Sequence, residues 1–88
     1  MEQGTQIAYI PRHAKGDIQH RDVEFGFVVK EQGNSHFCRY WSRINPGELR
    51  TTSCSELTPT ANLVEHKTYP QHVIDHWLKR LGCQERER

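Results

Sequence analysis

The segment Ser35–Arg43 has the sequence SHFCRYWSR, and it decides how the rest of the chain is interpreted. Successive side chains of a β-strand point to opposite faces, and this run alternates in that way. One face would carry Phe37, Arg39, Trp41 and Arg43, and the other His36, Cys38, Tyr40 and Ser42. We expect one face to line a core. The other would then meet the solvent, and if it is the arginine face it can stack on bases or hold a protein partner.

The length and composition indicate one small soluble domain. The chain has 88 residues, of which 34% are hydrophobic and 26% charged, and its formal net charge is +1. A domain of this size buries a modest core and can fold without metal or disulfides. No apolar run approaches the roughly 18 residues of a membrane span, and residues 1–4 lack the layout of a signal peptide. We therefore expect a cytoplasmic protein without a membrane partner, in which any attraction to nucleic acid comes from a local patch.

Four other segments have the composition or placement of short strands. They are Thr5–Ile10, Phe25–Lys30, Glu48–Cys54 and Asn62–Glu65. Turn residues at 32–35 and 45–47 would join the second, third and fourth strands into an antiparallel meander. Alternation along the second strand predicts that Phe25, Phe27 and Val29 share a face.

The polar connection Arg12–Glu24 separates the first two strands. It is too long for a tight hairpin and is either an ordered functional loop or a floppy one.

The segment at about 69–81 is predicted to be an amphipathic helix. Thr68 and Gln71 fit a capping box, Pro70 is tolerated in the first turn, and Gly82 is placed to end the helix. An apolar stripe would pack on the strands or on a partner: Val73, Ile74, Trp77, Leu78 and Leu81. Residues 1–82 would then form a single domain, followed by a flexible charged tail at 83–88.

The order of strand, long loop, three meandering strands and short last strand is similar to an SH3-like barrel of the KOW or Tudor kind. The strings GTQIAYIPRHAKGDIQHRDVEFGFV, FCRYWS and LRTTSCSELTP also resemble a set of small proteins encoded by bacteriophages and prophages. The resemblance covers most of residues 4–66 and implies a mainly β fold. That fold is a single SH3-like barrel of about five strands with one C-terminal helix packed on it. It also implies the cytoplasm of a bacterial host. SH3-like barrels bind peptides, methylated side chains or nucleic acid, and the fold alone does not choose among these ligands.

The first loop carries side chains that can ligate a metal. His13, Asp17 and His20, with Asp22 nearby, offer the imidazole and carboxylate groups that zinc and iron accept. Their spacing matches no zinc motif, and polar loops commonly carry histidines without a ligand. We therefore predict no metal and no cofactor here.

The remaining histidine and cysteine patterns indicate neither a metal site nor a disulfide framework. His72 and His76 are four residues apart and could chelate a metal, but they equally suit a solvated helix face. Cys38, Cys54 and Cys83 are odd in number and lack CxxC spacing, so free thiols are expected. The chain contains no nucleophile elbow, cysteine-hydrolase string or glycine-rich phosphate loop, and we predict that it is not an enzyme.

A local concentration of cations and aromatic rings is the strongest functional signal. The predicted contact residues are Lys30, Arg39, Tyr40, Trp41, Arg43 and Arg50. Arginine stacks on rings and grips phosphates or carboxylates, which favours a module that binds nucleic acid or a ribonucleoprotein. The alternative is a phage-type accessory protein that binds and modulates a host protein. Equally, Trp41 could pack under Trp77 of the helix and leave the arginines as ordinary surface charges. The oligomeric state, a monomer or a weak dimer, stays open.

Overall fold

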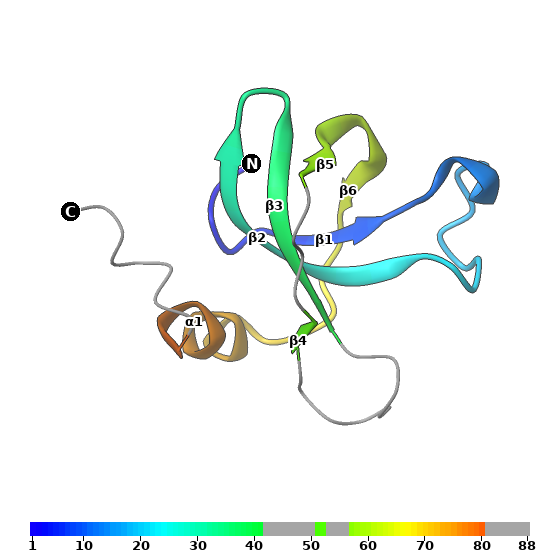
Figure 1. The fold of residues 1–88 in the computed structure, drawn as a ribbon. Coiled ribbons are helices and arrows are strands. Elements are labelled where there is room, and N and C mark those ends of the chain that lie inside the picture. The colour runs from blue at the N-terminus through cyan, green and yellow to red at the C-terminus, as the bar shows by residue number, and fades with distance from the viewer. Residues whose placement is uncertain (42–50, 53–56, 81–88) are drawn as a thin grey trace.

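A computed structural model describes residues 1–41, 51–52 and 57–80, and these residues form one antiparallel sheet with a helix beside it (Figure 1). The strands are β1 (Gln6–Tyr9), β2 (Glu24–Gln32), β3 (Ser35–Trp41), β4 (Thr51–Thr52), β5 (Thr58–Pro59) and β6 (Leu63–Glu65). Two 3-10 turns, η1 (Arg12–Ala14) and η2 (Thr60–Asn62), precede β2 and β6, and the helix α1 spans Gln71–Arg80.

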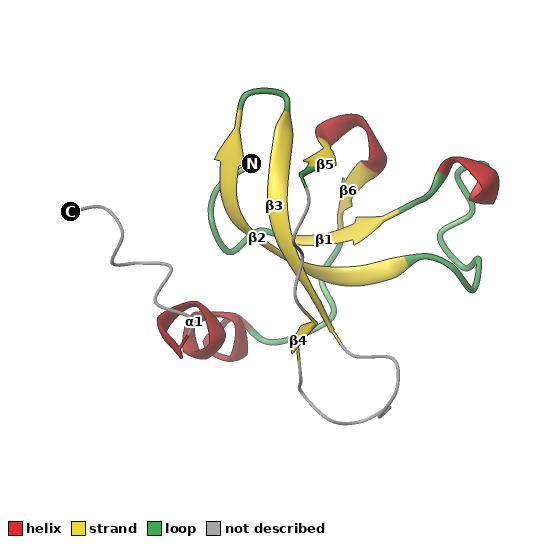
Figure 2. Cartoon of the chain, in the orientation of Figure 1, coloured by secondary structure: helices red, strands yellow, loops and turns green. Residues whose placement is uncertain are grey.

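Five strands follow one hydrogen-bonded path in the order β4-β3-β2-β1-β6, and β5 pairs with β3 (Figure 2). Every pairing is antiparallel. The path ends at β6 on one edge and at β4 and β5 on the other, so the described strands do not close into a barrel. The mainly β fold with one C-terminal helix is confirmed.

The predicted strands are found at their expected places, with shorter bounds for β1 and β6 and a longer β2. Of the predicted fourth strand only Thr51–Thr52 is described as β4, and the turn at 45–47 lies outside the described residues. The turn at 32–35 is confirmed as a two-residue connection in which Gly33 has a φ of 60°, a value that suits glycine. The short strand β5 was missed, because Thr58–Pro59 is too brief to show a period.

The β2–β3 hairpin dominates the sheet and contains one irregularity. Val28 pairs with Cys38 and Lys30 pairs with Phe37, so Val29 is an extra residue and forms a β-bulge. Such a bulge bends a strand and increases its twist. Val29 nevertheless packs with Phe25 and Phe27 against the same cluster, which confirms that the three residues lie on one side.

One face of β3 lines the core as expected, whereas on the other face Phe37 and Arg39 are half-buried and only Trp41 is buried. One face carries a cluster of Ile7, Val28, Cys38, Tyr40 and Leu63. The opposite face carries Phe27 and Trp41, which pack against Ile74 and Leu78 of α1. The helix therefore docks on the sheet through its predicted stripe, with Val73 and Trp77 partly buried at its margin. Leu81 and Gly82, like the tail at 83–88, lie outside the described residues.

The start of α1 is held by β1 and not by the predicted capping box. The side-chain oxygen of Gln6 accepts hydrogen bonds from the backbone N–H groups of Thr68 and Tyr69, at 2.8 and 2.9 Å. Gln71 donates instead to Asp75 within the helix, at 3.0 Å. A buried glutamine from a distant strand thus holds the segment that leads into α1.

The connection between β1 and β2 is an ordered loop. Successive backbone hydrogen bonds run through it, from Ala14 to Pro11, from Asp17 to Ala14 and from Val23 to His20. Ala14 and Val23 are buried with Ala8 of β1, which gives the loop a small core of its own. It projects from the sheet on the side away from α1 (Figure 1). In the described part of the chain, α1 is too short and too polar to cross a membrane.

Candidate functional site

The structure buries both of the rings that the sequence assigns to a binding surface on β3. Trp41 is 6% exposed and Tyr40 is 7% exposed. The Trp41 ring packs 5.4 Å from Phe27 and 4.2 Å from Tyr69, between the sheet and the segment that leads into α1. Tyr40 lies on the other face of the sheet from Trp41, and its hydroxyl is 3.3 Å from the Thr58 hydroxyl. Trp41 therefore does pack under α1, although its helix partners are Ile74 and Leu78 in addition to the partly buried Trp77.

The structure describes two of the four cationic residues that were predicted to bind. Arg39 is half-buried on β3, and Lys30 is exposed on β2. Arg43 and Arg50 lie outside the described residues.

A smaller cation and ring surface remains on the hairpin, and we call Lys30, Phe37 and Arg39 the hairpin surface. Lys30 and Phe37 are direct cross-strand partners, and Lys30 Nζ lies 5.1 Å from the centre of the Phe37 ring. Arg39 follows Phe37 by two residues and therefore points to the same face. Phe37 is half-buried, so part of its ring stays accessible. The surface therefore combines a lysine over a partly accessible ring with an arginine on the same face of β3.

A second pairing of this kind lies on α1. The guanidinium carbon of Arg80 is 5.3 Å from the centre of the half-buried Trp77 ring. The helix also carries the exposed Lys79 in its last turn. The sequence placed Trp77 in a stripe that packs on the strands or on a partner, and helical spacing alone does not say how far the margin of such a stripe is covered.

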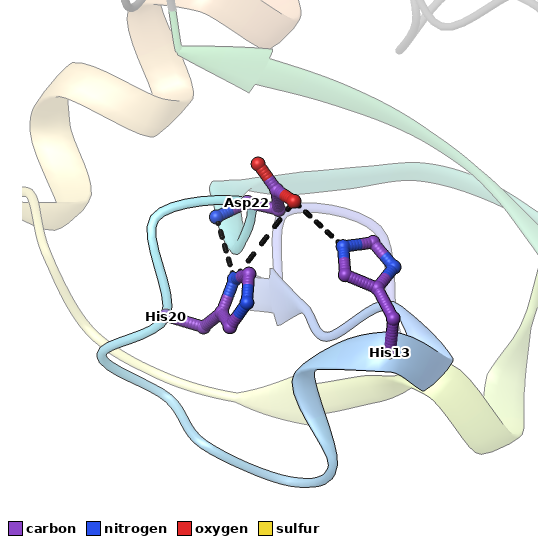
Figure 3. Close-up of side chains that lie close together, drawn as sticks. All are labelled: His13, His20 and Asp22. Atoms are coloured by element: carbon purple, nitrogen blue, oxygen red, sulfur yellow. Dashed lines mark hydrogen bonds and ion pairs between the residues drawn. The ribbon is translucent and has the colours of Figure 1, made fainter.

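The first loop brings three polar side chains to one point (Figure 3). His13 Nε2 lies 2.6 Å from Asp22 Oδ2, and His20 Nδ1 lies 3.9 Å from the same oxygen. The two imidazole rings stand edge to face with their centres 5.2 Å apart. One histidine comes from η1 and the other two groups from the end of the loop, so the contact joins both ends of the connection. We call His13, His20 and Asp22 the loop cluster.

The carboxylate in the loop cluster is Asp22 and not Asp17. Asp17 Oδ1 instead accepts a hydrogen bond from the backbone N–H of Gln19 at 3.0 Å, the bond of an Asx-turn. The hydrogen bond from His13, with smaller contributions from the neighbouring cations, holds the pKa of Asp22 below its ordinary value. The sequence named Asp22 only as a neighbour, because loop spacing does not show which carboxylate turns inward.

Comparison with known proteins gives no relative, since no family model, curated protein or solved structure matches the chain. The proposed function therefore rests on the geometry of the hairpin surface and of α1.

Proposed function

We propose that the protein is a non-enzymatic binding module that contacts nucleic acid, alone or in a ribonucleoprotein, through the hairpin surface. The pairing of Lys30 with Phe37, with Arg39 beside them, carries this proposal. A ring flanked by two cations offers a base a stacking plane and offers the phosphates on either side a positive charge. The two strands that hold these groups, β2 and β3, both contribute buried residues to the clusters on either side of the sheet, which supports a rigid surface.

The local charge also supports this function. Glu31 is the nearest carboxylate in sequence, but it pairs with His36 and so shares the face of β3 opposite to Phe37. The two cations of the hairpin surface are therefore not neutralised by it. The sequence pattern also assigns Arg43 and Arg50 to this contact, and both lie outside the described residues. The SH3-like barrel belongs to the same proposal, since barrels of that kind bind peptides, methylated side chains or nucleic acid.

A double substitution with a matched control tests the function. We expect fluorescence anisotropy to show wild-type protein binding labelled single-stranded DNA or RNA at low salt. Lys30→Gln with Arg39→Gln should weaken binding and make its salt dependence shallower by roughly one to two units, because about two phosphate contacts are lost. Lys15→Gln with Lys67→Gln removes the same charge from exposed positions elsewhere. It should leave the slope unchanged.

Two results would overturn the proposal. One is the absence of binding to single-stranded or double-stranded DNA or RNA at low salt, where attraction is strongest. The other is an equal loss in both double variants, which would mean that only the overall charge matters. Replacing Arg39 and Arg43 together, as the sequence suggests, gives a third variant that should behave like the first.

The second candidate function is contact with a host protein, and the burial of Trp41 favours it over extensive base stacking. On that view Trp77 and Arg80 form the contact, since tryptophan and arginine are the side chains enriched at interface hot spots. Binding of this kind loses little affinity with added salt and is weakened by Arg80→Ala, whereas the hairpin double variant leaves it unchanged. A pull-down from host lysate with and without nuclease separates the two candidates.

A further inference from the structure

We infer that the loop cluster is a binding site for a divalent transition metal of the zinc class. His13, His20 and Asp22 each offer one ligand atom, and the three atoms lie within 4.8 Å of one another. The site is separate from the hairpin surface, and the inference is independent of the proposed function. This inference differs from the prediction made from residue spacing, which was that the loop binds no metal. Residue spacing also named Asp17 as the carboxylate beside the two histidines, whereas the structure places Asp22 there.

The donor set suits this class of metal. Two imidazole nitrogens and one carboxylate oxygen are ligands that zinc and other borderline divalent ions accept, whereas calcium and magnesium prefer oxygen alone. Three protein ligands leave at least one position for water, and the three side chains are exposed enough to admit it, at 62% for His13 and 44% for Asp22. The predicted ligand number is therefore three.

The present distances are close to those that a metal requires. Atoms bound at about 2.0–2.2 Å to a tetrahedral metal are roughly 3.3–3.6 Å apart. Asp22 Oδ2 is nearer than this to His13 Nε2, at 2.6 Å, because a hydrogen bond joins them, and slightly farther from His20 Nδ1, at 3.9 Å. A metal placed among the three atoms would move each Asp22–histidine pair by about 1 Å or less, and the two histidine nitrogens, which lie within 4.8 Å, would approach by up to about 1.5 Å.

Two hydrogen bonds change when the metal binds. The proton shared by His13 and Asp22 leaves, since a metal ligand must offer a lone pair. His20 Nδ1 now accepts from the backbone N–H of Asp22 at 3.0 Å, which shows that this nitrogen carries the lone pair and that the lone pair is directed at that N–H. The metal would take over that lone pair and leave the N–H to water. Because existing bonds are exchanged, we expect micromolar affinity and not the tight binding of a closed zinc finger.

The backbone already supports the site. His13 lies in η1, which begins directly after Pro11. The turn ends at Lys15, which adopts a left-handed conformation with a φ of 52°. The hydrogen bonds from His20 to Asp17 and from Val23 to His20 fix the other half. A metal would connect the two halves of a loop that is ordered without it, and so would stabilise the folded protein.

Calorimetric titration of tag-free protein with Zn²⁺ tests the inference. We expect one ion per chain, a dissociation constant below about 100 μM and a melting temperature raised by several degrees at saturation. His13→Ala, His20→Ala and Asp22→Asn should each weaken binding at least tenfold, and the three exposed or half-exposed positions should tolerate the change. The double variant His72→Ala with His76→Ala removes the other close histidine pair and should bind like wild type.

Spectroscopy gives a second readout of the ligands. Bound Co²⁺ should produce visible d–d absorption, and zinc should shift the imidazole resonances of His13 and His20 but not those of His72. The inference is overturned if no saturable binding occurs below about 100 μM, or if the three loop variants bind as well as wild type. Loss of binding in the His72 and His76 variant would also overturn it, since the ion would then lie on α1.

Discussion

The side chain of Gln6 on β1 and the backbone of Tyr69 ahead of α1 are joined by two hydrogen bonds. The Gln6 amide nitrogen donates to the Tyr69 carbonyl at 2.5 Å, and the Gln6 oxygen accepts from the Tyr69 N–H at 2.9 Å. Gln6 is 7% exposed, so these bonds are shielded from water. The Tyr69 ring packs in turn on Trp41. One glutamine thus fixes where the chain turns from the sheet into the helix that covers it.

Replacing Gln6 with alanine should destabilise the protein by about 2–3 kcal/mol, because the N–H groups of Thr68 and Tyr69 would lose a buried acceptor. Urea denaturation measures this change. Gln32→Ala is the matched control at an exposed strand end, and it should change the free energy of unfolding by less than about 0.5 kcal/mol. Equal effects in the two variants would mean that Gln6 does not hold the helix.

Residues on the docked face of α1 should contribute to stability in proportion to how deeply they are buried. Ile74 is fully buried, and Ile74→Ala should cost about 3 kcal/mol through lost burial and the cavity left behind. Trp77 lies at the margin of the contact, so Trp77→Ala should cost less, about 1–2 kcal/mol, despite its larger side chain. His76→Ala on the outer surface is the control. A larger loss for Trp77 than for Ile74 in thermal or urea unfolding would contradict this docking.

Local patterns in the sequence were sufficient for the longer strands β2 and β3 and for the core stripe of the helix, but not for the two-residue strand β5. Period two in β2 and β3 and helical spacing around Ile74 and Leu78 come from neighbouring residues, and the structure agrees with them. Long-range contacts were not predictable in this way. No local signal pairs Gln6 with Tyr69. The sequence left two interpretations of Trp41 open, exposed or packed under the helix, and the second was decided by a helix thirty residues later that covers its face.

In the candidate sites, too, local sequence patterns predict some features, and long-range contacts decide the others. Alternation placed Phe37 and Arg39 on one face, but only the register of β2 against β3, which includes a bulge at Val29, put Lys30 over the ring. The loop histidines were recognised as possible ligands. The carboxylate that joins them depends on turns in which Asp17 bonds to Gln19 and Asp22 faces inward, and residue spacing does not encode that choice.

Gly26 should not tolerate a side chain. It pairs with Tyr40 where β2 and β3 approach closely, and a Cβ there would overlap the Arg39 carbonyl group and lie 2.8 Å from the Tyr40 Cα. Because the obstacle is backbone, relief requires the strands to separate, and Gly26→Ala should cost at least about 3 kcal/mol. Gly16→Ala is the control, since open space surrounds it and only its positive φ opposes the change, at about 1 kcal/mol. Similar melting temperatures for the two variants would contradict this prediction.

The contact between His13 and Asp22 should be visible in the acid titration of the metal-free protein. NMR should show the Asp22 carboxyl titrating with a pKa below the ordinary value of 3.8, because the hydrogen bond from His13 favours the charged form. A folded-state pKa below the unfolded one means that the contact stabilises the protein above about pH 4. That contribution is lost as the pH falls through the folded value. His13→Ala should return the pKa toward 3.8, whereas His76→Ala should leave it unchanged. An Asp22 pKa that is the same in wild type and His13→Ala would show that the two side chains do not interact in solution.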